Sequence, residues 1–214
     1  KIYITYGDHD MAENIIHLVL ARTPGAPEGT KGISLFIVPK FFVNDDGSLG
    51  DRNDVKCIGL EDKLGIHASP TCVMSFGEND GAVGWLIGSE NTGMAAMFTM
   101  MNNARLNVGI QGVGLAEQAT QIAMSYAADR FQGRAPDADR GDNSPVPIAT
   151  HPDVRNMLMT MRSLTDAARA ICYENGVFHD LAHFGGDEKA KAFNDLLTPI
   201  SKAFSTCLLY TSDA

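Results

Sequence analysis

Residues Met94–Arg134 read MAAMFTMMNNARLNVGIQGVGLAEQATQIAMSYAADRFQGR and carry the longest regular pattern in the chain. Apolar side chains recur there at steps of three and four, interrupted only by Gln111, at Met97, Met101, Ala104, Val108, Leu115, Ala119, Ile122 and Tyr126. Steps of three and four are the repeat of an α-helix. The pattern therefore predicts one long helix over Met94–Tyr126, which ends near Arg130.

Two arginines stand on this predicted helix, Arg105 near its middle and Arg130 one turn beyond Tyr126. At about 1.5 Å of rise per residue they lie roughly 37 Å apart, so no single small ligand can contact both. Either they are unrelated surface charges, or they serve two different sites.

The first part of the chain alternates short β-type runs with turns rich in Gly, Pro, Asn and Asp. The expected strands are Ile2–Thr5, Ile15–Arg22, Ile33–Phe42, Val55–Leu60, Thr71–Phe76 and Val83–Ile87. Strands this closely spaced leave no room for crossover helices, which excludes a doubly wound sheet. We therefore expect residues 1–88 to form a small antiparallel β-barrel or sandwich.

The second part of the chain keeps the helical repeat, interrupted by a polar loop at residues 132–150 and by Gly185-Gly186-Asp187. A second helix is expected to begin at His151-Pro152-Asp153, because proline is favoured in the first turn of a helix. A third helix is expected to begin near Glu188. The predicted fold class is α+β, in which residues 89–204 form an antiparallel helical bundle that is cut short.

Composition and charge narrow the class of protein. A hydrophobic fraction of 44% and a charged fraction of 20% suit a folded protein with a core. The formal net charge of -9 argues against non-specific nucleic-acid binding. The cysteines are widely spaced and favour a reducing compartment, the bacterial cytoplasm in preference to the mitochondrial matrix. No apolar run approaches the ~20 residues of a membrane-spanning helix. Because a strand pattern already begins at Ile2, we expect further sequence upstream.

Residue chemistry alone supports neither a metal centre nor a catalytic nucleophile. His179 and His183 have the i, i+4 spacing of helical zinc ligands but lack the adjacent glutamate of a zinc protease, so no metal site is expected. The sequence holds no Gly-x-Ser-x-Gly motif. Gly109, Gly112 and Gly114 lie inside the long helix and predict close helix–helix packing rather than a phosphate loop.

Several segments, taken together and in this order, resemble the acyl-CoA dehydrogenase family. They are Tyr3–Gly7, Lys63–Thr71, Gly84–Gly88 with Asn91–Met94, Asn103–Ala116, and Tyr126–Arg130 with Gln132–Arg134. The resemblance extends to about Phe204, and residues Ser205–Ala214 form a tail that does not share it. The long loop and its Gln-Gly-Arg opening are similar to the branch that contains 3-methylthiopropionyl-CoA dehydrogenases.

The resemblance implies a β domain set between two helical domains, with FAD bound between the β domain and the C-terminal helices. In that family a glutamate removes the α-proton of an acyl-CoA while the β-hydride passes to flavin N5. By position, Tyr3 would pack on the flavin ring and Thr5 would form a hydrogen bond near N5. The alternative is that both are ordinary strand residues, since tyrosine and threonine favour strands.

The resemblance also implies roles for polar residues of the helical part. Asn102 and Arg105 would line the channel for the CoA thioester. Arg130 and Gln132 would reach the FAD pyrophosphate and nearby atoms in a neighbouring subunit, and His151 would be a further FAD contact. The implied partners are an acyl-CoA substrate, electron-transfer flavoprotein as acceptor, and further copies of the chain in a homodimer or homotetramer.

The chain also departs from the family pattern. The usual catalytic glutamate lies further toward the C-terminus than Ala214, and Ala104 occupies the position at which some relatives place theirs. No catalytic residue is therefore expected within this chain. The alternatives are a flavin-dependent acyl-CoA oxidase on the same scaffold and a non-catalytic helical oligomerisation module. A glutamate in the following segment would favour an enzyme, and slow reaction of the reduced flavin with oxygen would favour a dehydrogenase.

Overall fold

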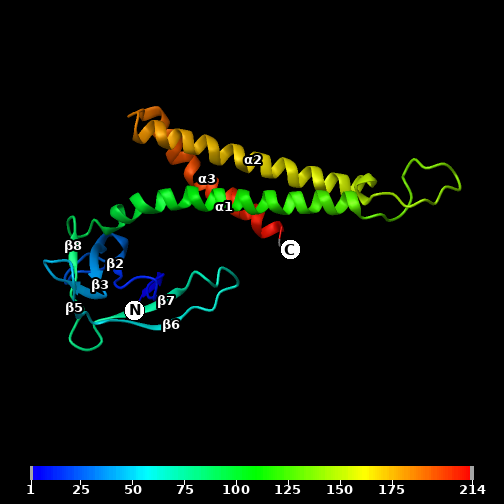
Figure 1. Ribbon diagram of the computed structural model, residues 1–214. Coiled ribbons are helices and arrows are strands. Elements are labelled where there is room, and N and C mark those ends of the chain that lie inside the picture. Colours follow the sequence, from blue (N-terminus) through cyan, green and yellow to red (C-terminus); the bar gives the residue numbers. More distant parts are fainter. Residues whose placement is uncertain (1, 213–214) are drawn as a thin grey trace. The chain divides into compact units, whose positions relative to one another are not determined.

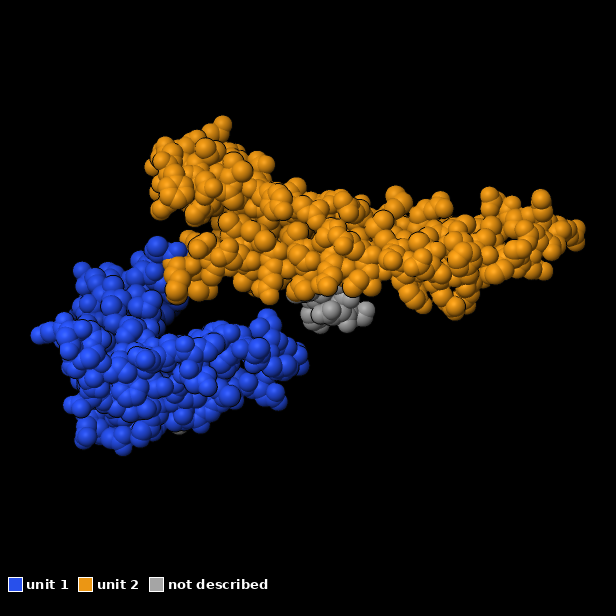
Figure 2. Space-filling view, viewed as in Figure 1, with its two compact units in different colours: residues 1–99 blue, residues 100–214 orange. Residues whose placement is uncertain are grey.

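The computed structural model describes residues 2–212 and divides into two compact units, Lys1–Thr99 and Met100–Ala214 (Figure 2). Strands supply the regular structure of the first unit, and helices supply that of the second, so the predicted α+β class is confirmed. Among the described residues, no helix is both long enough and apolar enough to cross a membrane.

The first unit is built from antiparallel strands (Figure 1). They are β1 Ile2–Thr5, β2 Ile16–Ala21, β3 Ser34–Pro39, β4 Phe41–Val43, β5 Leu49–Arg52, β6 Val55–Leu60, β7 Thr71–Phe76 and β8 Trp85–Ile87, with a 3-10 helix at Gly29–Gly32. One sheet has the order β1-β7-β6, another the order β2-β3-β8, and β4 pairs with β5. The sheets formed by the described strands are open, so the arrangement is a sandwich and not a closed barrel.

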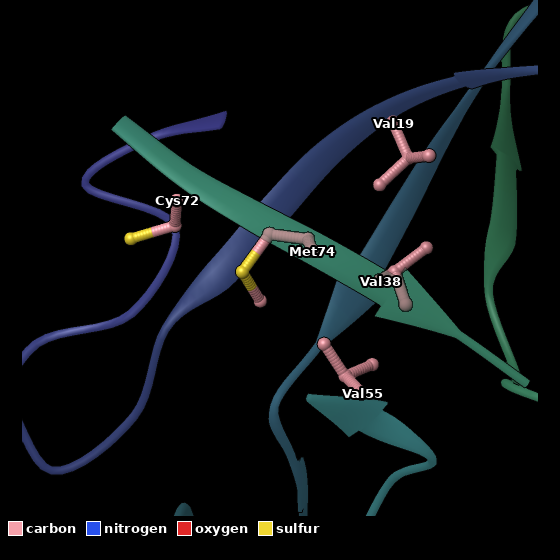
Figure 3. Packing of buried hydrophobic residues seen from close by; sticks show 5 residues of the cluster. All are labelled: Val19, Val38, Val55, Cys72 and Met74. Atoms are coloured by element: carbon pink, nitrogen blue, oxygen red, sulfur yellow. The ribbon is translucent and has the colours of Figure 1, made fainter. Parts of the chain in front are cut away.

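Both three-stranded sheets contribute side chains to one core (Figure 3). Val19 and Val38 come from β2 and β3, while Val55, Cys72 and Met74 come from β6 and β7. Buried residues alternate along the first part of β2 and over Cys72 and Met74 of β7, so that these strands turn one face inward. Cys72 and Met74 lose nearly all contact with solvent, which makes β7 the centre of this unit.

The expected strand Ile33–Phe42 is divided into β3 and β4, because the chain changes partners at Lys40. The Lys40 N–H donates to Ile15 O at 2.8 Å, and the Lys40 carbonyl accepts from Asn53 N at 3.0 Å. These bonds end β3 at Pro39 and start β4 at Phe41, which pairs with β5 instead. Strand β5 was not expected, since its Leu-Gly-Asp-Arg sequence lacks the usual strand formers and depends on its pairing with β4.

The second unit contains most of α1, Gly93–Asp129, together with α2, Pro152–His183, and α3, Glu188–Ser212 (Figure 1). The long first helix and the predicted starts of the second and third helices are confirmed. Figure 1 shows α1 and α2 side by side and antiparallel, joined by the long loop of residues 130–151, as a bundle requires.

The buried face of α1 is not its stripe of large apolar residues. Much of the predicted apolar stripe faces solvent, where Ile122 is 63% and Tyr126 61% exposed. The buried face instead carries mainly small residues, at Leu106, Gly109, Gly112, Val113, Ala116, Thr120 and Ala127. This face repeats at the same helical steps, but the periodicity of large apolar residues could not reveal it.

Small residues are needed because α3 crosses α1 at close range. A Cβ on Gly109 would lie 3.1 Å from Ser201 O, whereas Gly114 has no heavy atom within 4 Å of such a Cβ. Close packing is therefore confirmed for Gly109, and also for Gly112, where a Cβ would lie 2.7 Å from Ser205 O. It is wrong for Gly114, which lies on the open side of the helix.

The residues after Phe204 continue α3 as far as Ser212. Ser205 is buried and its hydroxyl lies 3.4 Å from Cys172 Sγ. Leu208 packs against the buried cluster that contains Val113. Residues of the segment that does not share the family resemblance thus contribute to the helical core.

Candidate functional site

Tyr3 and Thr5 lie on the outer face of β1, because Ile2 and Ile4 turn toward the buried Met74 cluster. The ring of Tyr3 is 65% exposed. Thr5 is also exposed, and its hydroxyl forms no hydrogen bond with residues 2–208. Strand β1 therefore presents a bare aromatic ring and an unused hydroxyl on one surface.

Asn102 and Arg105 lie one helical turn apart on α1. The Arg105 guanidinium donates from Nη1 to Asn102 Oδ1 over 3.4 Å. An i, i+3 spacing places two side chains on the same face of a helix, so the pair presents a cation and an amide together.

The structure brings Arg130, Gln132 and His151 together, although a long loop separates them in sequence. The Arg130 carbonyl accepts from Ile148 N at 2.8 Å, where the loop returns beside the end of α1. His151 Nε2 lies 2.7 Å from Gln132 O, and because a carbonyl only accepts, Nε2 donates this bond. Gly133 has a φ of 67°, a left-handed conformation that suits glycine at the turn.

We call the group formed by Arg130, Gln132 and His151 the corner, and Arg130 supplies its positive charge. Its side chain is exposed, and within the described part of the chain it has no carboxylate partner. An unengaged guanidinium offers a planar pair of N–H donors that matches the oxygens of a phosphate. The corner thus has the chemistry of an anion contact.

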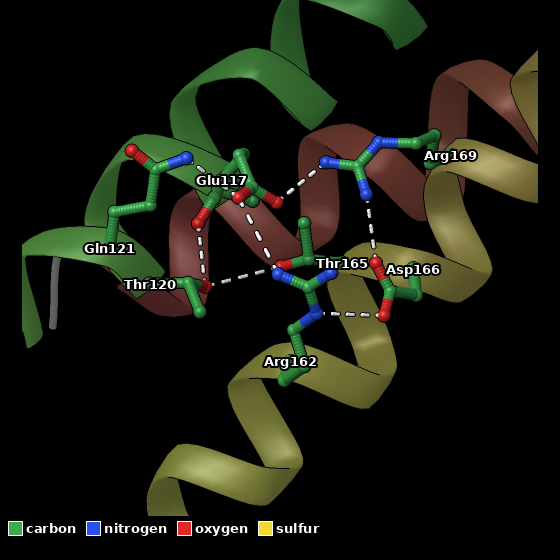
Figure 4. A network of polar contacts seen from close by, with 8 residues as sticks. Glu117, Thr120, Gln121, Arg162, Thr165, Asp166 and Arg169 are labelled. Atoms are coloured by element: carbon green, nitrogen blue, oxygen red, sulfur yellow. Dashed lines mark hydrogen bonds and ion pairs between the residues drawn. The ribbon is translucent and has the colours of Figure 1, made fainter. Parts of the chain in front are cut away.

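A polar network that the sequence reading missed joins α1 to α2 (Figure 4). Arg169 donates from Nη2 to Glu117 Oε2 at 2.5 Å and from Nη1 to Asp166 Oδ1 at 2.8 Å. Arg162 donates from Nε to the other oxygen of Asp166 at 2.8 Å. The charged residues of α2 recur at i, i+3 and i, i+4, a spacing that predicts a polar helix face. Their partner on α1, Glu117, could not be predicted from spacing.

The network leaves Glu117 unsuited to proton transfer. The hydrogen bond from Gln121 and then the hydrogen bond from Arg169 hold the pKa of the Glu117 carboxyl below its usual value. A general base works best when its pKa lies near the operating pH. Glu117 is therefore a structural contact between helices.

Comparison with known proteins identifies the family of the chain. Residues 91–183 match the sequence model of the family described as "Acyl-CoA dehydrogenase, C-terminal domain". Over 209 residues, 96% of its length, the chain is 50% identical to 3-methylmercaptopropionyl-CoA dehydrogenase of Ruegeria pomeroyi. The chain belongs to the acyl-CoA dehydrogenase family. Enzymes of this family depend on FAD.

Two further proteins extend the comparison. A butyryl-CoA dehydrogenase of Syntrophomonas wolfei is 44% identical over the whole chain. The crystal structure of Caenorhabditis elegans ACDH-11 in complex with C11-CoA shares the fold, with a TM-score of 0.74 over 96% of this chain and 31% of that one, at 22% identity. The chain spans 35% of the length of the two curated relatives, about a third of each.

Proposed function

We propose that this chain is part of an FAD-dependent acyl-CoA dehydrogenase that introduces an α,β double bond into an acyl-CoA thioester. The observation that carries the proposal is the exposed pair of Tyr3 and Thr5 on β1, in a chain 50% identical to a dehydrogenase of this family. A bare aromatic ring can stack on a flavin, and an unused hydroxyl can bond to it. These residues fit FAD.

The cofactor contacts follow from the exposed groups. FAD, when bound, accepts the hydride that leaves the β-carbon of the substrate. Thr5 donates a hydrogen bond near N5, and Tyr3 covers the ring. Arg130 binds the pyrophosphate of the FAD in a neighbouring subunit, with Gln132 and His151 as further contacts. The bond from His151 to Gln132 O supports this assignment, because it holds the two residues in one corner.

The substrate contacts lie on α1, where Asn102 and Arg105 line the channel for the CoA thioester. The α-proton requires a base, which we assign to a carboxylate outside these 214 residues. Two observations support this assignment. Ala104 has no titratable group, and Glu117 is occupied by arginines.

The proposal also covers the substrate, the electron acceptor, the oligomeric state and the compartment. The names of the two relatives favour a short acyl chain, of the size of 3-methylmercaptopropionyl or butyryl. Electron-transfer flavoprotein is the proposed electron acceptor, the assembly is a homodimer or homotetramer, and the compartment is the bacterial cytoplasm. A neighbouring subunit is required by the role given to Arg130.

The proposal is tested on the full-length protein loaded with FAD. Under anaerobic conditions, butyryl-CoA and 3-methylthiopropionyl-CoA are titrated while flavin absorbance and enoyl-CoA formation are measured. Stoichiometric bleaching with formation of the enoyl-CoA is expected. Oxygen is then admitted to the reduced protein, and rapid reoxidation would indicate an oxidase instead. Failure to retain flavin at all would indicate a non-catalytic module.

A further inference from the structure

Tyr6, the residue directly after Thr5, has an unusual backbone. Its φ is 54°, in the left-handed region that a bulky side chain rarely adopts. The next residue is Gly7, which has its own role. A Cβ at position 7 would lie 2.9 Å from Met74 Cγ, so a larger residue would clash there. The chain therefore holds a tyrosine in a strained conformation immediately beside the proposed flavin contact. Contacts of the tyrosine must offset that strain.

Those contacts reach the segment paired with Thr5. Tyr6 donates from its backbone N to Pro70 O at 2.8 Å and from its hydroxyl to Ala68 O at 3.3 Å. Both acceptors lie just before Thr71, which is the cross-strand partner of Thr5 in the β1–β7 ladder. Tyr6 thus ties the end of β1 to the loop that enters β7, immediately beyond the Thr5–Thr71 pair.

The same loop is also bound by Lys63. The Lys63 ammonium donates to Ile66 O at 2.9 Å and to Ser69 O at 2.5 Å. Ile66 also has a φ of 54°, which is strained for a β-branched residue. Tyr6 and Lys63 between them bind the carbonyls of residues 66, 68, 69 and 70, so the conformation of the loop depends on these two residues. Strained residues that are held this firmly are typical of functional sites.

We propose that Tyr6 is a positioning residue, which fixes the end of β1 so that the Thr5 hydroxyl is presented to the flavin. The inference rests on the proposed function of Thr5. Tyr6 does not itself touch the flavin in this scheme. Its hydroxyl and its left-handed backbone hold the end of β1, where Thr5 lies, so the effect of Tyr6 on FAD passes through Thr5.

The test uses the full-length protein with the variants Thr5→Val, Tyr6→Phe, Tyr6→Asn and the double variant Thr5→Val/Tyr6→Phe. The dissociation constant of FAD is measured by the quenching of flavin fluorescence, and thermal unfolding is followed in parallel. Tyr6→Phe removes only the hydroxyl, whereas Tyr6→Asn removes the ring but adopts the left-handed backbone readily. Tyr126→Phe, at an exposed site on α1, is the matched control.

Tyr6→Phe and Tyr6→Asn are each expected to weaken FAD binding about threefold, the effect of losing one modest hydrogen bond. In the Thr5→Val background, Tyr6→Phe is expected to add nothing, because a positioning residue acts only through the group it positions. Tyr126→Phe is expected to leave FAD affinity unchanged.

Three results would overturn the inference. If Thr5→Val weakens FAD binding while both Tyr6 variants match the parent, Tyr6 has at most a structural role and the function of Thr5 stands. Additive effects of the two substitutions would show that Tyr6 acts independently of Thr5. An unchanged affinity in Thr5→Val would remove the flavin role of Thr5, and the inference with it.

Discussion

Gly112 of α1 lies so close to Ser205 of α3 that a Cβ on Gly112 would sit 2.7 Å from the Ser205 carbonyl oxygen. A carbonyl oxygen belongs to the backbone and cannot move aside as a side chain does. Three further small or polar groups, Gly109, Cys172 and Ser201, surround the same crossing. The distance between the two helices is therefore set by the absence of side chains on α1.

Gly112→Ala is expected to destabilise the full-length protein by about 1–3 kcal/mol, because an overpacked interface forces the helices apart. Gly114→Ala is the matched control, since a Cβ there meets no heavy atom within 4 Å. Alanine is the better helix former, so this change is expected to be neutral or stabilising by about 0.5–1 kcal/mol. Thermal unfolding followed by circular dichroism measures both. Equal effects of the two substitutions would contradict the close crossing.

The spacing of apolar residues predicted the helices of the second unit but not which face of α1 is buried. A run of helical repeats depends only on local spacing, and so the start of α2 at Pro152 could be read directly. Which face of α1 is buried depends on where α3 crosses, and that is a contact between distant segments. Large residues such as Ile122 lie on the exposed side of α1, because this crossing requires glycine.

The candidate site was predictable only as far as its residues belong to recognisable segments. Tyr3 and Thr5 could be named from the strand pattern and the family resemblance together. Tyr6 could not be named, because a left-handed backbone at a tyrosine leaves no trace in residue spacing. The bond between His151 and Gln132 was likewise hidden, since it depends on how the long loop returns to α1.

Asn53 supports the turn between β5 and β6, and its replacement by alanine is expected to be costly. The buried amide donates to Pro39 O at 3.0 Å and to Val83 O at 2.8 Å, and it accepts from Val83 N at 3.0 Å. Asn53→Ala leaves these backbone groups without partners, so we expect a loss of about 2–4 kcal/mol in the free energy of unfolding. Chemical denaturation of the full-length protein measures it.

The control for this prediction is Asn44→Ala, in the exposed turn between β4 and β5. Asn44 donates from its amide to Ser48 Oγ at 2.9 Å, but water can replace that bond. The expected loss is below about 1 kcal/mol. A loss at Asn53 no greater than that at Asn44 would mean that the three backbone groups find other partners.

Glu117→Gln is expected to alter the dependence of stability on pH. The pKa of the Glu117 carboxyl is lowered from its ordinary value of 4.5 by hydrogen bonds from Gln121 and Arg169. A carboxyl whose pKa is lower in the folded state stabilises the protein above the unfolded value, and this contribution is lost as the pH falls through the folded value. The melting temperatures of the parent and the variant should therefore differ by a constant amount above about pH 5.5 and converge at lower pH. Parallel curves down to the acid limit would contradict the ion pair.

Arg130→Ala is expected to loosen FAD in the assembled full-length protein. The exposed guanidinium would lose charge-assisted bonds to the pyrophosphate, worth about 1.5–3 kcal/mol, which corresponds to about a 10- to 150-fold rise in the dissociation constant of FAD. Arg140→Ala, an exposed arginine in the same polar loop, is the matched control and should retain flavin. Arg105→Ala should instead raise KM for the acyl-CoA while flavin stays bound, because that residue lies on the substrate side of the proposed site. Flavin content after dilution and gel filtration separates these outcomes, and an Arg130 variant that keeps its flavin as well as the parent would refute the pyrophosphate contact.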